Sequence, residues 1–210
     1  MWIMTVIRIA SIDAPLNTVG LRGPALDLVR RALAVGLLRD RPLIGKLDLD
    51  LLRGIAREAS AAGVGRDAAL ELLGKPSPRH LGSVIGRLED ALASSPMPQR
   101  ELGVLLEVFD VDQLATLLDT SAVSLRRYVT GTRTVPDAVA ARIHWLALVS
   151  SDLAGAYNAL GIRLWFERPR TQLHGQSPRQ LLGRGWDPDD ARVDQVRALA
   201  AALAGPGGAA

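Results

Sequence analysis

The spacing of apolar residues along the chain predicts a protein built almost wholly of α-helices. Through most of the sequence, apolar residues recur every three or four positions, which is the period of a helix with one buried face. Breaks that contain glycine or proline separate these stretches. The predicted helices are Ala25–Leu38, Asp48–Ala62, Asp67–Leu73, Pro78–Ser94, Gln99–Phe109, Asp112–Leu118, Ser121–Thr130, Pro136–Leu160 and Asp187–Ala204.

Strand-like patterns are confined to two short segments. Met1–Ile12 alternates loosely between apolar positions, which fits a short strand or an extended arm. A second short strand is predicted near Gln172–Leu173. Ser11–Pro24 holds two prolines and two glycines and is predicted to be a loop. With so little strand, the pattern predicts an all-α fold.

One internal similarity stands out. The segment Leu47–Leu52 resembles Phe109–Leu114, and each precedes a glycine-then-proline break and a further helix. The two regions differ in length, so aligning them as helical repeats would need an insertion of about five residues. A duplication and a chance similarity both remain open at this point.

Composition narrows the function classes. The 210 residues allow one large domain or two small ones, and 48% hydrophobic residues are enough for a packed core. The chain has no cysteine, which excludes disulfides, cysteine-type zinc sites and thiol nucleophiles. Three scattered histidines, and no grouping of Ser, His and Asp, leave little for catalysis. We therefore expect no metal site, no cofactor and no enzyme activity.

No segment predicts a membrane span, because charge interrupts every apolar run well before about 18 residues. The first residues lack the basic region of a signal peptide. We expect a cytoplasmic protein. The acidic residues Asp187, Asp189 and Asp190 are predicted to cap the last helix and complement its dipole, rather than to bind a metal.

The most specific motif lies in Val111–Pro136, which has the order of a helix-turn-helix. Its first helix would bury Leu114, Ala115 and Leu118, with a turn at Asp119–Thr120. Ser121 would cap the second helix, whose inner side would be Val123 or Leu125 together with Tyr128. The residues left to face a DNA groove or its phosphates are Ser121, Ala122, Ser124, Arg126, Arg127 and Arg133.

Short hydroxyl side chains and arginines suit base edges and phosphates. The spacing resembles the helix-turn-helix of Xre-type, phage-repressor-like regulators. The alternative is a plain three-helix bundle with surface arginines. The local charge is unfavourable for DNA binding. Although the whole chain has a formal net charge of +3, residues 101–149 hold four arginines against six acidic residues. A single copy should bind DNA weakly, so we expect an even-numbered homo-oligomer that reads paired half-sites.

A second motif occupies Gly161–Ala204. A Trp-Phe pair ends a helical stretch, a proline stops it, and Ser177–Pro178 begins a short helix before the alanine-rich last one. This order resembles the toxin-binding domain of Xre/MbcA/ParS-type antitoxins, in which the same kind of helix-turn-helix precedes the domain. The two matches together cover about residues 99–204, half of the chain.

The resemblance implies an antitoxin that inhibits a RES-domain toxin, which degrades NAD⁺, and that represses its own operon by binding operator DNA. The residues it assigns to toxin binding are Trp165, Phe166, Pro169, Leu173, Gly175, Ser177, Pro178, Leu181, Leu182, Arg197 and Leu203. It also places the segment around Arg197–Leu203 near the mouth of the toxin active site.

Two alternatives accompany this interpretation. One is a stand-alone transcriptional regulator whose C-terminal module serves dimerisation or another protein partner. The other is a scaffold in which the helix-turn-helix is only structural and the C-terminal apolar residues are only core.

The predicted domain organisation has four parts. These are a helical N-terminal extension of unknown role (1–95), an Xre-like helix-turn-helix domain (96–150), a toxin-binding domain (151–204) and a flexible tail (205–210). The segment Ser94–Pro98 marks the first boundary because it is short and rich in serine and proline.

Overall fold

The computed structural model describes residues 9–39 and 45–203. Within them it has eleven α-helices, one short 3-10 helix and a two-stranded parallel sheet, so the all-α prediction is confirmed. The chain divides into two compact units near Pro96–Met97, and each unit is described by itself. The predictions for Met1–Arg8 and for the tail at 205–210 lie outside the described residues.

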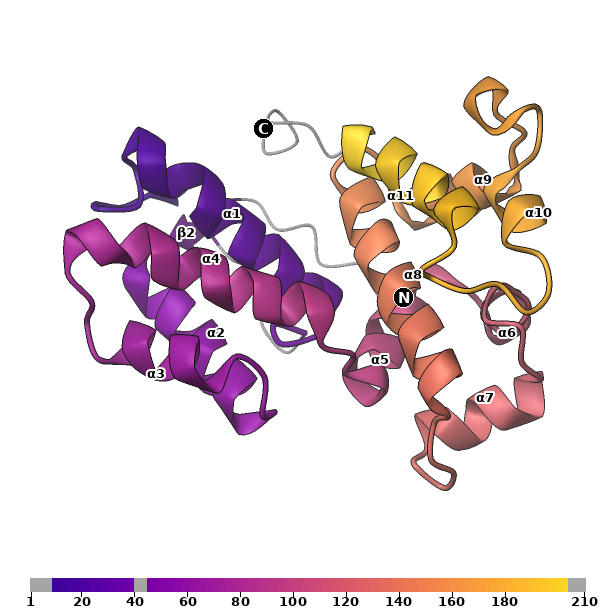
Figure 1. The fold of residues 1–210 in the computed structure, drawn as a ribbon, viewed down its shortest axis with the longest axis horizontal. Helices are drawn as coiled ribbons and strands as arrows, with labels where there is room; N and C mark the ends of the chain where they lie inside the picture. Colours follow the sequence, from indigo (N-terminus) through magenta and orange to yellow (C-terminus); the bar gives the residue numbers. More distant parts are fainter. Residues whose placement is uncertain (1–8, 40–44, 204–210) are drawn as a thin grey trace. The chain divides into compact units, whose positions relative to one another are not determined.

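The N-terminal unit has four helices and the small sheet. Strand β1 (Ser11–Ile12) pairs with β2 (Lys46–Leu47). The helices are α1 (Val19–Ala34), α2 (Leu49–Ala61), α3 (Arg66–Leu73) and α4 (Pro78–Ser94). Figure 1 shows α1 lying along α4, with α2 and α3 beneath them. The Arg31 Nε donates to Glu89 Oε1 across α1 and α4 at 2.7 Å.

The C-terminal unit has seven helices around one hydrophobic core, which runs from Leu102 to Ala200. They are α5 (Pro98–Val108), α6 (Val111–Leu117), α7 (Ala122–Val129), α8 (Asp137–Ala154), α9 (Ala159–Glu167), α10 (Pro178–Leu182) and α11 (Ala191–Leu203). Helix α8 packs against α5, α9 and α11. Residue 150, the predicted division between two functions, therefore lies inside a helix of this shared core.

Several predicted helix limits are wrong, each for a local reason. The predicted helix Pro136–Leu160 is two helices, because Asn158 caps α9 by accepting from the Gly161 N–H at 2.8 Å. The predicted strand at Gln172–Leu173 is part of the 3-10 helix η1 (Thr171–Leu173). There the chain curls back, and the Arg170 carbonyl accepts from the Leu173 N–H at 3.0 Å.

The first helix also differs from its prediction. Helix α1 begins at Val19, inside the segment predicted as loop, and accommodates Pro24. Only the Gly20 carbonyl loses its helical donor there, and Gly20 is exposed to water. The helix ends earlier than predicted because Gly36 adopts φ 76°.

The turns α2–α3 and α6–α7 end their first helix in the same way but differ before the second helix, where Gly65 has φ 54° and Ser121 has φ −85°. Both end the first helix with the hydrogen bonds of a Schellman motif, around one residue in the left-handed region. The pairs are Gly63 N–H with Ser60 C=O and Val64 N–H with Ala59 C=O in the first turn, and Asp119 N–H with Thr116 C=O and Thr120 N–H with Ala115 C=O in the second.

The helices that follow these turns match as well. Helices α3 and α7 each have eight residues, with buried side chains at their fourth and seventh positions. Those residues are Ala69 and Leu72 in α3, and Leu125 and Tyr128 in α7. Each unit thus contains a helix-turn-helix, followed by a long helix of 17 or 18 residues.

Candidate functional site

The predicted helix-turn-helix in the C-terminal unit begins with α6. Its cap is Asp110, two residues before the predicted helix start at Asp112, because the Asp110 carboxylate accepts from the Gln113 N–H at 2.8 Å. The Gln113 Oε1 in turn accepts from the Asp110 N–H, which completes a capping box. Leu114, Ala115 and Leu118 are buried as predicted, so this helix is fixed on the core.

The turn after α6 is held by residues far along the chain. Asp119 adopts φ 49°, and its Oδ2 accepts from the Gly185 N–H at 2.9 Å. The Trp186 indole N–H donates to the Leu117 carbonyl at 2.8 Å. Arg142 Nη1 donates to the carbonyl of the next residue, Leu118, at 3.3 Å. The angle between α6 and α7 therefore depends on tertiary contacts.

Helix α7 begins at its predicted cap. The Ser121 Oγ accepts from the Ser124 N–H at 3.1 Å. Leu125 and Tyr128 are 0% and 2% exposed, whereas Val123 is 57% exposed. The inner side of α7 is therefore Leu125 with Tyr128, which decides between the two predicted choices.

The outer side of α7 carries the six residues predicted to contact DNA. Ser121, Arg126, Arg127 and Arg133 are exposed, while Ala122 and Ser124 are half-buried. Figure 1 shows this helix beside the amino-terminal end of α8.

Arg133 joins the α7 surface although it follows the helix. Its Nη1 donates to Ser124 Oγ at 3.2 Å, and its guanidinium lies 5.6 Å from the centre of the Tyr128 ring. Ser121 Oγ also donates to Ser124 Oγ, at 3.0 Å. The structure thus brings two hydroxyls and one guanidinium of the predicted set together.

The charge balance at α7 is more favourable than the net count of the segment. Of the acidic residues over 101–149, Glu101 is buried, Asp110 caps α6, and Asp119 faces Gly185 and Arg142. Within the part of the chain that the structure describes, no carboxylate pairs with Arg126 or Arg127. Their charges are therefore open to an anionic ligand.

Val123 is a surface residue that the sequence analysis left undecided. It lies on the outer side of α7, among residues that are otherwise polar or basic. Its two-residue distance from Leu125 could have identified it, because two helical steps place a side chain on the opposite face.

The residues assigned to toxin binding fall into two groups. Most are part of the core or of its local caps, and they are buried: Trp165, Phe166, Leu173, Ser177, Pro178 and Leu182. Phe166 packs edge-on against Phe109 of α5–α6, with ring centres 5.6 Å apart. Ser177 and Gln180 form the capping box of α10, so the predicted cap of this short helix is confirmed.

The remaining residues of that set are accessible. Pro169 and Gly175 are exposed, Leu181 and Arg197 are half-buried, and Leu203 is 38% exposed. Helix α11 begins at Ala191, and the Asp190 carboxylate accepts from the Arg192 N–H at 2.9 Å. An aspartate of the acidic cluster thus caps the last helix.

A buried ionisable pair links α5 to α8. His144 Nδ1 lies 2.5 Å from Glu101 Oε1, and Glu101 is 0% exposed. Burial raises the pKa of the Glu101 carboxyl above its ordinary value, and the hydrogen bond from His144 partly opposes that rise. The pair lies inside the helix packing, not at the α7 surface.

Within residues 9–39 and 45–203, no group of three or more His, Asp or Glu side chains could hold a metal ion. None of the described helices combines the length and apolar character that a membrane span requires. No protein-family model, curated protein or solved structure matches the chain.

Proposed function

We propose that this chain is a DNA-binding antitoxin of the cytoplasm. Helices α6 and α7 bind operator DNA and repress the operon, and the C-terminal part of the unit binds and inhibits a RES-domain toxin that degrades NAD⁺. The observation that carries the DNA-binding part is the outer side of α7, where two arginines and a hydroxyl stand free of carboxylates on the second helix of a helix-turn-helix.

The arrangement of that surface suggests a division of roles. The first residues of a reading helix contact base edges, so Ser121 and Val123 would face bases. Val123 is suited to the methyl group of thymine. Arg126 and Arg127 can bond guanine edges or phosphates, and Arg133, held against Ser124, would contact the backbone beside them. An even-numbered homo-oligomer would add the affinity that one copy lacks.

The toxin-binding part is supported by the order of sequence motifs over 99–204. In the structure, accessible side chains at the end of the last helix are available for it, above all Leu203. A stand-alone regulator is the second candidate. The burial of Trp165, Phe166 and Leu173 favours it, because these residues are accounted for by the core they share with the helix-turn-helix.

The DNA-binding part is tested by replacing Arg126→Ala and Arg127→Ala together and measuring affinity for the DNA upstream of the gene at several salt concentrations. We expect a loss of affinity, and a salt dependence of log K that falls by about 0.9 for each phosphate contact removed. The matched control is Arg57→Ala with Arg66→Ala, two exposed arginines of the N-terminal unit. Equal affinity of the α7 variant and the wild type would exclude α7 as the reading helix.

The toxin-binding part is tested by co-expression with a RES-domain protein encoded beside the gene, with cellular NAD⁺ as the readout. The variant is Arg197→Asp with Leu203→Asp, and we expect it to lose protection. Deletion of α11 is unsuitable, because Val193, Val196 and Ala200 belong to the core. If the wild-type chain gives no protection, the stand-alone regulator is the better interpretation.

A further inference from the structure

The outer side of α9 carries an unusual density of exposed apolar side chains. Eight large apolar residues are exposed among the described residues, and three of them lie within eight positions. Leu160 and Leu164 are 55% and 39% exposed and lie one helical turn apart, and Tyr157, just before the helix, is 36% exposed. They form a short apolar ridge.

The opposite side of α9 is already used by the core. Ile162, Trp165 and Phe166 are almost fully buried there. A helix that is apolar on both sides normally has protein on both sides. The ridge of Leu160 and Leu164 is therefore a surface that the described residues of the C-terminal unit leave uncovered.

Two arginines follow directly after α9 in the chain, and neither has a matching carboxylate among the described residues. Arg170 lies over the Trp165 ring, 4.5 Å from its centre, and Arg168 is exposed close by. Burial lowers the pKa of Arg170, and the charge of Arg168 adds to that effect against the opposing influence of Tyr157. In the described part of the chain, no acidic side chain forms an ion pair with Arg168 or Arg170.

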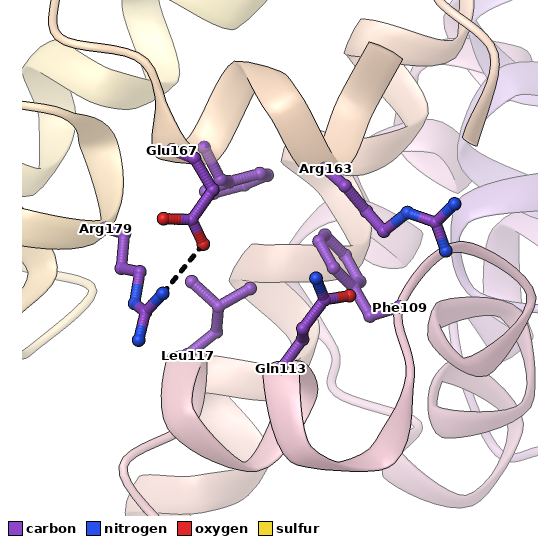
Figure 2. Close-up of a pocket in the computed structure, with 7 residues that line it drawn as sticks. Phe109, Gln113, Leu117, Arg163, Glu167 and Arg179 are labelled. Atoms are coloured by element: carbon purple, nitrogen blue, oxygen red, sulfur yellow. Dashed lines mark hydrogen bonds and ion pairs between the residues drawn. The ribbon is translucent and has the colours of Figure 1, made fainter. Parts of the chain in front are cut away.

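Two more arginines, Arg163 and Arg179, lie on α9 and α10. Figure 2 shows Arg163 and Glu167 of α9 and Arg179 of α10 above Gln113 and Leu117 of α6, around a small hollow. Glu167 Oε1 accepts from Arg179 Nη1 at 2.9 Å, while the Arg163 side chain is directed away from that pair. Around α9, the one glutamate of the helix is thus already paired with Arg179, whereas Arg163 and Arg168 have no ion pair among the described residues.

We propose that this surface binds an acidic amphipathic helix of a partner protein. Apolar side chains of that helix would cover Leu160 and Leu164, and its flanking carboxylates would pair with Arg163 and with Arg168. A helix that places its apolar face on a complementary surface is a common mode of peptide recognition. Opposite charge at the rim fixes orientation and accelerates association.

Other occupants fit this surface less well. A second copy of the chain would bring its own Arg163 and Arg168 against these two arginines, which is repulsive. Nucleic acid would neutralise the arginines but would leave the leucines uncovered, because its phosphates offer no apolar surface. The inference rests on one part of the proposed function, namely that the C-terminal module binds a protein.

The test uses the full chain and a labelled synthetic helix with leucines along one face and glutamates flanking them, with fluorescence anisotropy as the readout. We expect binding, and at least about a tenfold loss of affinity for Leu160→Ser with Leu164→Ser. Arg163→Glu with Arg168→Glu should weaken binding similarly. The matched control is Val19→Ser with Leu70→Ser, which removes exposed apolar side chains of the N-terminal unit.

Three results would overturn the proposal. These are equal binding of a peptide with lysine in place of glutamate, affinity unchanged by the Leu160 and Leu164 substitutions, and a wild-type chain whose α9 surface binds duplex DNA or anionic lipid vesicles in preference to the acidic helix. Circular dichroism of each variant checks that the fold is retained.

The same variants separate this inference from the proposed function. If the acidic helix binds at α9 but the chain neither protects against the neighbouring RES-domain protein nor binds operator DNA, the surface stands and the antitoxin function fails. If protection is complete in the Leu160 and Leu164 variant and the acidic helix does not bind, the antitoxin function stands and the α9 surface fails.

Discussion

The two helix-turn-helix segments have similar helices and differ in their surfaces. Helices α3 and α7 have the same length, follow a first helix that ends in the same way, and share buried residues at their fourth and seventh positions. At equivalent exposed positions, α3 has Asp67, Leu70 and Glu71 where α7 has Val123, Arg126 and Arg127. The comparison teaches that the fold alone does not make a DNA-binding site, and that the outward residues decide whether phosphates are attracted or repelled.

The neighbourhoods of the two helices strengthen this difference. Glu71 of α3 forms an ion pair with Arg87 of α4, so even its carboxylate is engaged within the unit. In α7, by contrast, Arg133 is drawn to Ser124 and adds a positive charge to the surface. The N-terminal unit therefore contains a helix-turn-helix whose outward residues do not favour DNA binding.

The largest expected effect comes from exchanging the outward residues. Arg126→Leu with Arg127→Glu gives α7 the residues of α3, and we expect at least about a hundredfold loss of operator affinity. The reciprocal change, Leu70→Arg with Glu71→Arg, should raise non-specific DNA affinity by less than about tenfold, because one helix contributes few phosphate contacts. Electrophoretic mobility shifts measure both. If the α7 variant kept its operator affinity and the α3 variant gained operator affinity, the outward residues would not explain the difference between the two helices.

A smaller effect separates the two turns. Gly65 adopts φ 54°, and a Cβ there would lie 2.9 Å from both Ala91 Cβ and Leu88 Cδ1. We expect Gly65→Ser to lower the free energy of unfolding by about 1–3 kcal/mol. At the equivalent position of the other turn, Ser121→Gly should cost only a few tenths of a kcal/mol, because glycine is tolerated as a helix cap. Urea denaturation compares the two, and equal costs would contradict the difference.

The smallest expected effect concerns the side-chain pairs that join the first and last helix of a helical group, Glu101–His144 between α5 and α8 and Arg31–Glu89 between α1 and α4. Because the folded pKa of Glu101 is raised, its contribution favours folding below its ordinary pKa of 4.5 and is lost as pH rises through the raised value. Relative to Glu101→Gln, the wild type should therefore lose unfolding free energy as pH rises from about 4 to about 8. Urea denaturation across this range is the measurement.

Glu89→Gln, at the Arg31–Glu89 pair of α1 and α4, is the matched control, because these side chains are 20% and 21% exposed. A wild-type profile parallel to that of Glu101→Gln would show that burial of Glu101 carries no pH-dependent cost.

Much of the fold followed from local sequence. Pro78–Ser94 was predicted with its observed limits, because serine and proline flank a strict apolar period. Ser121 was predicted as the cap of α7 because capping depends on the residue type and its three-residue spacing. These features need no information from distant residues.

Other features were missed. The cap of α6 was missed although it is local, because Asp110 and Gln113 have the three-residue spacing of a capping box. The similarity of the two helix-turn-helix segments was only partly visible in the sequence. Helix α2 has 13 residues and α6 has seven, so the distance from helix cap to turn differs between them. The open surface of α9 required knowing which side of that helix the core takes.

The contacts of Gly185 and Trp186 with the α6–α7 turn have a consequence for how the motif could be moved between proteins. A segment that ended after α8 would retain α6 and α7 and lose the donors that reach Asp119 and Leu117. It would also uncover Trp145, whose ring packs edge-on against Trp186. This helix-turn-helix therefore cannot be transferred to another protein by itself. A transferred segment must extend as far as Trp186 to keep the contacts that hold the turn.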